Sequence, residues 1–206
     1  MSETNVSVNA ELRDVAEEVA EQQLAAAARA EVLLDVEDLS VTLFTEDGAL
    51  PAIRNLSLVM RRGETLAVVG ESGCGKSMTA LSIMGLLPQP PAKIVGGKIV
   101  LEGTDLAQLS RDEMRAWRGS KIGMIFQEPM TSLNPVMTAG RQIREGILVH
   151  NPKMPKKDAD ARALEMIRLV GIPAPEKVFR SYPHELSGGM RQRVMIAMAL
   201  ACQRST

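Results

Sequence analysis

The apolar pattern that begins at Val32 suits short β-strands. Residues 39–43 alternate between apolar and polar side chains, and residues 53–60 and 98–101 form further short apolar runs. Glu-Asp-Gly at residues 46–48 supplies a turn between the first two runs. The pattern therefore predicts several short strands joined by turns.

Two other runs are almost continuously apolar, as expected of strands buried inside a sheet. Residues 65–69 read Thr-Leu-Ala-Val-Val, and residues 121–126 read Lys-Ile-Gly-Met-Ile-Phe and end at Gln127. Continuous runs of this kind are typical of parallel strands that are covered on both faces. We expect both runs to be strands, with the first at the centre of a parallel sheet.

The remaining apolar positions follow a helical pattern. Residues 76–87 contain no proline and are rich in Ala, Leu, Met and Ile, and residues 111–118 resemble a shorter helix. From Pro135 to Phe179 we expect only helices and loops. One helix there has apolar residues at helical spacing and ends at a glycine and a proline: Ala163, Met166, Ile167, Val170, Gly171 and Pro173. Strands followed by helices predict an α/β core with a small helical subdomain.

A glycine-rich segment joins the apolar run 65–69 to the helix predicted at 76–87. It fits the pattern G-x-x-x-x-G-K-[ST], in which backbone N–H groups surround a phosphate chain. A helix N-terminus behind the loop attracts the same anion, Lys76 adds a positive charge, and the Ser77 hydroxyl suits Mg²⁺. The candidate phosphate-binding residues are Gly70, Glu71, Ser72, Gly73, Cys74, Gly75, Lys76 and Ser77.

Composition narrows the class of protein. No apolar run approaches the length of a membrane span, and no signal peptide opens the chain, so we expect a cytosolic protein. A net charge of −1 and an aromatic content of 2% give no support to nucleic-acid binding. Residues 1–31 differ from the rest: they hold seven acidic residues against two arginines. We interpret residues 11–30 as a solvated helix, with a regulatory or partner-docking arm as the alternative.

A second glycine turn opens the last predicted helix. Residues 186–193 read Leu-Ser-Gly-Gly-Met-Arg-Gln-Arg and lead into the apolar residues 194–201. A Ser-Gly-Gly turn at a helix start exposes free backbone amides, and by itself it is usually only a cap. When it follows a phosphate loop and an apolar run that ends in Gln127, the same turn is strong evidence for a functional motif.

Together these segments resemble the ATP-binding subunits of ABC transporters. In that comparison residues 70–77 are the Walker A motif, Gln127 is the Q-loop glutamine and residues 186–190 are the signature motif. Residues 126–135 and 182–193 resemble the dipeptide and oligopeptide importer ATPases, including glutathione importers. The resemblance covers about residues 33–202 and leaves residues 1–31 outside.

The resemblance implies a fold and a set of residue roles. The fold is a P-loop NTPase (RecA-like) α/β core with an antiparallel β subdomain and a helical subdomain, lacking the C-terminal part of the core. It implies that residues 70–77 hold the ATP phosphates and that Ser77 and Gln127 contact Mg²⁺. The signature residues would bind the ATP of a partner domain: Ser187, Gly188, Gly189 and Met190. Leu43 occupies the position at which the family usually stacks an aromatic ring on adenine, and strand alternation places Phe44 on the opposite face unless a β-bulge re-aims it.

Partners and segment boundaries also follow from the resemblance. The expected partners are a second ABC ATPase domain (identical, different or fused), membrane permease subunits and, indirectly, a periplasmic or lipid-anchored substrate-binding protein. The expected location is the cytoplasmic face of the inner membrane, and the expected function is ATP-driven uptake of di- or oligopeptides or of glutathione. We divide the chain into an extension (1–31), P-loop core and β subdomain (32–129), helical subdomain (130–186) and signature helix with a truncated end (187–206).

The chain departs from the family at two further points. Met190 stands where many members carry Gln. More importantly, the family continues past the signature helix into an apolar strand ending in Asp-Glu and then a switch histidine, and residues 203–206 supply neither. His184 precedes the signature motif and is interpreted as structural. Because the general base is missing, we expect the 206-residue chain alone to be inactive as an ATPase.

Three alternatives remain open at this stage. The chain could be a non-catalytic, truncated ABC module that binds or regulates. It could be an ABC ATPase that acts outside transport, which residues 130–135 disfavour. A P-loop kinase is the third, but it would not need the turn at Ser187.

Overall fold

The computed structural model describes residues 31–126 and 132–202. The chain forms two compact units that divide between Leu109 and Ser110. The predicted helix at residues 11–30 lies outside the described residues. No helix in the described part of the chain is long and apolar enough to cross a membrane.

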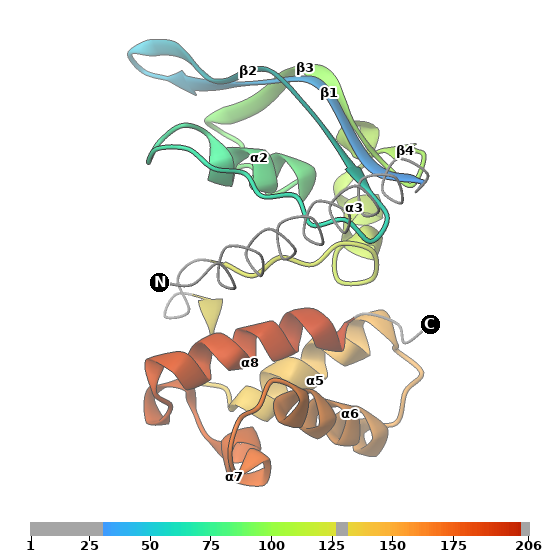
Figure 1. Ribbon diagram of the computed structural model, residues 1–206. Helices are drawn as coiled ribbons and strands as arrows, with labels where there is room; N and C mark the ends of the chain where they lie inside the picture. The colour runs from blue at the N-terminus through green and yellow to red at the C-terminus, as the bar shows by residue number, and fades with distance from the viewer. Residues whose placement is uncertain (1–30, 127–131, 203–206) are drawn as a thin grey trace, which may run out of the picture. The chain divides into compact units, whose positions relative to one another are not determined.

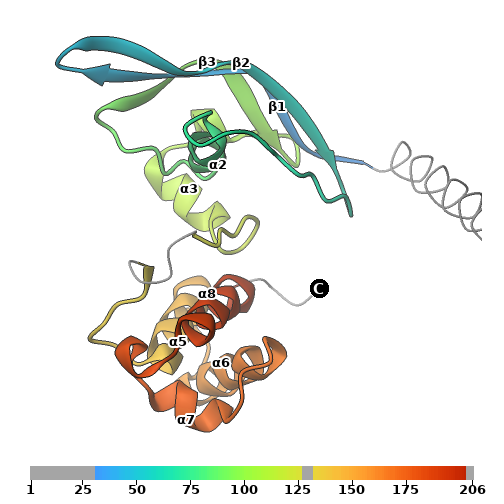
Figure 2. The ribbon, with the colours of Figure 1, turned by 60° about the vertical axis from the view of Figure 1, so that its left-hand side comes forward.

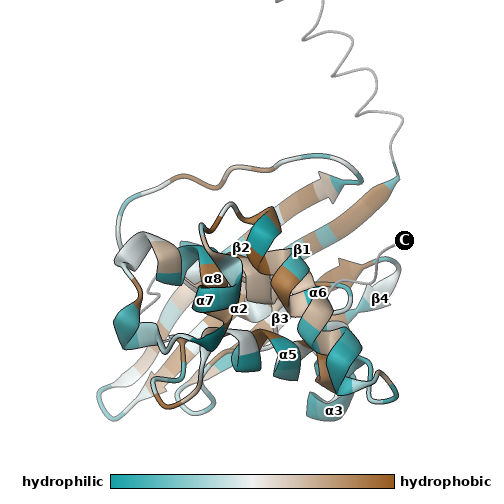
Figure 3. Ribbon diagram, turned by 90° about the horizontal axis from the view of Figure 1, so that it is seen from below, coloured by the Kyte–Doolittle hydropathy of each residue, from teal (hydrophilic) through white to brown (hydrophobic). Residues whose placement is uncertain are grey.

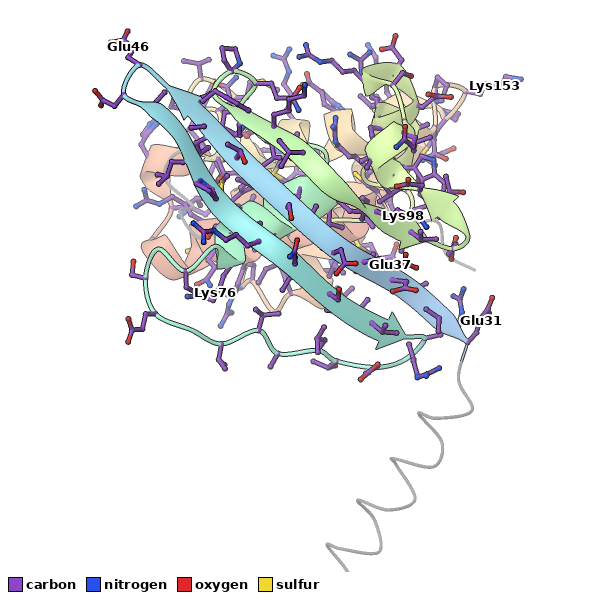
Figure 4. All side chains as sticks on the ribbon, turned by 90° about the horizontal axis from the view of Figure 1, so that it is seen from above. Glu31, Glu37, Glu46, Lys76, Lys98 and Lys153 are labelled. Atoms are coloured by element: carbon purple, nitrogen blue, oxygen red, sulfur yellow. The ribbon has the colours of Figure 1, made fainter. Side chains whose placement is uncertain are left out.

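An antiparallel sheet with the strand order β2-β1-β3-β4 forms most of the first unit. Its strands are β1 (Val32–Thr45), β2 (Gly48–Arg61), β3 (Ala92–Leu101) and β4 (Thr104–Asp105), and a 3-10 turn, η1 (Leu106–Gln108), follows. The predicted runs at 39–43, 53–60 and 98–101 all lie within these strands. Figure 4 shows Glu46 at the tip of the long β1–β2 hairpin.

One face of this sheet is apolar and buried. Val36, Leu39 and Val41 on β1 and Ile99 on β3 are fully buried. The pairing of β1 with β3 shifts register between Glu37 and Ser40 and again between Ser40 and Val41, so the strict two-residue alternation of side chains is interrupted there. Figures 1 and 2 both show the helix α2 (Lys76–Ile83) on one side of the sheet.

The two predicted core strands are not strands here. Residues 65–69 run as an irregular segment, and Leu66, Val68 and Val69 are 40%, 54% and 89% exposed. Residues 121–126 contain only an isolated bridge between Ile122 and Arg118. A strand forms only against a hydrogen-bonded neighbour, and the described residues supply no neighbour to either run.

The second unit is helical, as predicted for residues 135–179. Its elements are α3 (Arg111–Trp117), α5 (Ala139–His150), α6 (Lys156–Leu169), α7 (Pro175–Arg180), η2 (Pro183–Glu185) and α8 (Gly188–Ala201). Hydrophobic and hydrophilic positions both occur along α5 and α6 (Figure 3), as expected of half-buried helices. The helix α3 begins with a capping box, in which hydrogen bonds from Ser110 lower the pKa of Glu113.

The core of the second unit lies among α5, α6 and α8. Ile143 and Ile147 of α5, Ile167 of α6 and Val194 of α8 are almost completely buried. The sequence predicted the buried face of α6 correctly, since Ala163 and Met166 are buried beside Ile167. Gly171, at φ +68°, ends that helix as predicted.

Candidate functional site

The glycine-rich loop ends in a helix whose first amides are open. Gly75 is the N-cap of α2 with φ 97°, and its carbonyl oxygen accepts the Thr79 N–H at 2.8 Å. The N–H groups of the first helical turn, from Lys76 to Met78, have no acceptor within the helix. No side chain caps this end of α2. The helix therefore presents unsatisfied donors and the positive end of its dipole at the loop.

The Lys76 ammonium lies inside the curve of the loop. Its Nζ donates to the carbonyl oxygens of Gly70 and Glu71, each at 2.6 Å, and lies 3.5 Å from Cys74 Sγ. Space is open beside Gly73, where an added Cβ would meet nothing within 4 Å. A cation, free amides and open space in one loop fit an anionic phosphate chain.

The sheet supports this loop directly. A Cβ at Gly75 would lie 3.3 Å from Ala52 O and 3.5 Å from Ile53 Cγ1, so the loop packs on β2. A positive φ combined with this close approach suits glycine alone. A Cβ at Gly70 would lie 2.6 Å from Cys74 Sγ, so a larger residue there would require the Cys74 side chain to move. The supporting residues on β2, Ala52 and Ile53, were not predicted from the sequence, in which Ile53 is only the first residue of an apolar run.

A divalent cation has one candidate ligand in this loop. Ser77 is exposed in the first turn of α2, directly after Lys76, and its hydroxyl oxygen is of the kind that Mg²⁺ binds. The second predicted Mg²⁺ contact, Gln127, lies outside the described residues. Among the described residues, no group of three or more His, Cys, Asp or Glu side chains could hold a metal ion.

The predicted signature turn lies in the second unit. Ser187 is the N-cap of α8, and its Oγ accepts the Met190 N–H at 3.3 Å. Gly188 and Gly189 are exposed, and a Cβ on either would meet nothing within 4 Å. Leu186, only 4% exposed, anchors the turn in the helical core. The turn thus exposes two glycines and a hydroxyl at a helix N-terminus.

A hydrogen-bonded turn precedes this surface and was not predicted. The Tyr182 N–H donates to Glu185 Oε2 at 2.7 Å, and the Leu186 N–H donates to Pro183 O at 3.2 Å. The rings of Tyr182 and His184 are stacked with centroids 5.6 Å apart. This arrangement accords with a structural role for His184. The proline after Tyr182 was the signal in the sequence that a turn begins there.

Leu43 lies on the face of the sheet that the loop contacts. It is two residues after the fully buried Val41, and both pair with β3 without a register shift between them, so these two side chains share one face. The pairing of β1 with β2 does shift register between Val41 and Thr42. Leu43 itself is half-buried. Phe44 is 53% exposed and lies on the opposite face, as strand alternation predicts.

Comparison with protein families and known proteins agrees with these motifs. The model of the ABC transporter family matches residues 53–206. The chain is 52% identical over 174 residues to the probable peptide ABC transporter ATP-binding protein y4tR of Sinorhizobium fredii, covering 84% of this chain and 52% of that protein. It is 54% identical over 169 residues to the oligopeptide transport ATP-binding protein OppD of Bacillus subtilis, covering 82% of this chain and 47% of that protein.

A solved structure gives the same result for the fold. A dimeric, post-hydrolysis structure of the ATP-binding cassette MJ0796 bound to ADP and Pi superposes with a TM-score of 0.72 at 29% identity, covering 82% of this chain and 69% of that one. The chain spans about half the length of the curated relatives described above. A family match over most of the chain, peptide-transport relatives and a shared fold lead to one conclusion: this chain belongs to the ABC transporter family.

Proposed function

We propose that this chain is the ATP-binding part of a peptide-importing ABC transporter. The observation that carries the proposal is the loop at residues 70–77, where the Lys76 ammonium and the open first-turn amides of α2 converge. The peptide substrate class is supported by the names of relatives about half identical to this chain. Glutathione is one small peptide that such an importer would carry.

The chain's own residues would bind ATP through charge and geometry. The amides of Lys76, Ser77 and Met78 would donate to phosphate oxygens, and Lys76 would exchange its two carbonyl acceptors for those oxygens. Ser77 and Gln127 would hold Mg²⁺, which supplies neutralisation of the phosphate charge. Phosphoryl transfer depends mainly on such positioning and on charge stabilisation.

The signature turn would serve a second nucleotide, held by a partner ATPase domain. Ser187, Gly188 and Gly189 are exposed at a helix N-terminus, where an anion is favoured. The dimeric state named for MJ0796 supports this arrangement. Membrane permease subunits, and through them a substrate-binding protein, complete the proposed assembly at the cytoplasmic face of the membrane.

A polypeptide of these 206 residues should bind ATP without hydrolysing it. The sequence holds no apolar strand ending in Asp-Glu after α8, and no histidine follows the signature turn. Activation of the attacking water requires a base within hydrogen-bond reach. Phosphate release by this polypeptide that depends on Mg²⁺ and on Lys76 would contradict this part of the proposal.

A chimera tests the transport role. Residues 33–202 would replace the matching segment of the oligopeptide transport ATP-binding protein OppD of Bacillus subtilis, and peptide uptake would be measured in cells lacking that protein. We expect uptake with the chimera and none with a chimera carrying Lys76→Ala. A stable, ATP-binding chimera without uptake would contradict a peptide-transport role.

Ser187→Arg in the same chimera tests the proposed partner contact. A long cation at the turn should block closure onto the partner's nucleotide and abolish hydrolysis, while ATP binding to the single subunit stays unchanged. Loss of ATP binding with intact pairing would show that Ser187 does not act on the partner's nucleotide.

A further inference from the structure

The apolar segment at residues 65–69 is an exposed surface of the first unit. Leu66, Val68 and Val69 are 40%, 54% and 89% exposed, and no described strand pairs with the segment. Contiguous exposed apolar side chains of this kind mark a place where another segment or another molecule binds.

The N-terminal arm, residues 1–30, enters the described fold beside this segment. The Arg62 N–H donates to Glu31 O at 2.9 Å, and Arg62 Nε lies 3.7 Å from Glu31 Oε2. Figure 4 shows Glu31 beside the end of β2, where the chain leaves the sheet toward residues 65–69. The arm therefore begins next to the exposed segment.

The sequence of the arm suits a helix with one narrow apolar face. Leu12, Val15 and Val19 recur at helical spacing, and we call them the apolar stripe. On a helix, the acidic side chains of this part of the arm fall on the opposite face: Glu11, Asp14, Glu17, Glu18 and Glu21. One side of such a helix suits apolar contact and the other suits water.

The reach of the arm fits the position of the exposed segment. With a rise of about 1.5 Å per helical residue, Val15 of the apolar stripe would lie about 24 Å from Glu31 along the helix. With about 3.3 Å per extended residue, Val69 lies at most about 23 Å from Arg62 along the chain. Because Glu31 and Arg62 are joined by a hydrogen bond, the two apolar sets lie at matching distances from one point.

Tethering favours the arm over a second copy of the chain as the occupant of this surface. A segment joined through a short linker is present at an effective concentration in the millimolar range, whereas separate chains at micromolar concentration meet far less often. Both occupants would bury the same valines, so the difference in concentration decides between them.

We propose that the arm folds back onto residues 65–69 of the same chain as an amphipathic helix, with its apolar stripe covering Val68 and Val69. The acidic face of the helix then stays in water, and the segment that leads into the phosphate loop is shielded from other chains. The arm lies outside residues 53–206, which the family model matches, so this cover is a feature of the chain beyond its family. It does not depend on ATP binding.

Photo-cross-linking of the 206-residue chain tests the contact directly. Val15→p-benzoylphenylalanine places a cross-linker in the apolar stripe, and Ala25→p-benzoylphenylalanine places the same group on the acidic face as a matched control. Mass spectrometry identifies the linked residues, and mixing isotope-labelled with unlabelled chains separates links within one chain from links between two. We expect links from position 15 to residues 65–69 within one chain, and none to that segment from position 25.

Self-association provides a second measurement. Val15→Asp combined with Val19→Asp puts two charges into the apolar stripe, and uncovering the segment should raise the association constant at least about tenfold in sedimentation equilibrium. Ala25→Asp combined with Ala28→Asp adds the same charges to the acidic face and should raise nothing. Added charge by itself favours solubility, so an increase in the first variant cannot come from charge alone. Adding Val69→Lys to that variant should reverse the increase.

The two measurements together decide the proposal. Links from position 15 to residues 65–69 only between chains would mean that a second copy covers the segment, and would overturn it. Equal linking to the segment from positions 15 and 25 would show that the contact has no preferred face and would overturn it as well. Unchanged or weaker association of the variant with two aspartates in the apolar stripe would have the same consequence.

Discussion

Single residues of this chain are constrained chiefly by backbone geometry. Gly75 combines a positive φ with close contact to β2, and Lys76 can reach two loop carbonyls only because the loop curls around it. Gly97 on β3 is constrained in the same way as Gly75, at the point where β3 passes the irregular stretch of β1. With φ +87°, its added Cβ would lie 2.4 Å from Glu37 O and 2.6 Å from Asp38 O.

Gly97→Ala should therefore destabilise the first unit more than a matched glycine substitution. Gly103 also has a positive φ, +79°, but a Cβ there meets nothing within 4 Å. We expect Gly103→Ala to cost about 1–2 kcal/mol from backbone strain, and Gly97→Ala to cost at least about 1 kcal/mol more from the clash with backbone atoms. Urea unfolding of both variants measures the difference. Equal losses would mean that the β1 backbone moves aside freely.

At the scale of elements, local sequence patterns were sufficient to predict the helices and the phosphate loop. They were not sufficient to predict which segments would pair as strands. The loop at residues 70–77, the start of α2 and the buried face of α6 were predicted because their signals lie within a few residues of sequence, whereas α2 ends at Ile83 and not at Leu87 as predicted. The strands predicted at 65–69 and 121–126 were wrong for this chain, since a strand depends on neighbours that no local pattern guarantees. The contact of Gly75 with β2 depends on the register of a hairpin and was likewise invisible in the sequence.

The helix α8 offers a prediction at this scale. Ser187→Ala removes the Oγ that accepts the Met190 N–H and should lower the free energy of unfolding of the second unit by about 1 kcal/mol. Ser187→Thr keeps the acceptor and should cost much less. Chemical denaturation followed by circular dichroism measures both. If both variants lose the same stability, the side-chain cap is not what holds the start of α8.

The whole molecule carries an apolar segment that its described residues leave uncovered. Leu66, Val68 and Val69 are exposed and unpaired between β2 and the phosphate loop. Extended, exposed apolar segments with free backbone groups promote association between chains.

Val69→Lys should consequently reduce self-association of the 206-residue chain. The control is Val136→Lys, because Val136 is 77% exposed but lies in a loop of the helical unit. Sedimentation velocity at micromolar concentration should show fewer oligomers for Val69→Lys alone. An equal effect of both substitutions would indicate a general benefit of added charge rather than a property of the segment at 65–69.

The central claim is that the loop at residues 70–77 binds the phosphates of ATP through Lys76. Calorimetric titration of MgATP into the unmodified chain and into its Lys76→Ala variant tests this claim most directly. Losing one charge-assisted contact should weaken binding by roughly ten- to a hundredfold. Lys98→Ala is the matched control, since Lys98 pairs with Glu37 on the sheet at 3.4 Å and should not affect ATP. The account predicts tight binding to the unmodified chain and to Lys98→Ala, and weak binding to Lys76→Ala. Equal affinity for all three folded proteins would contradict it.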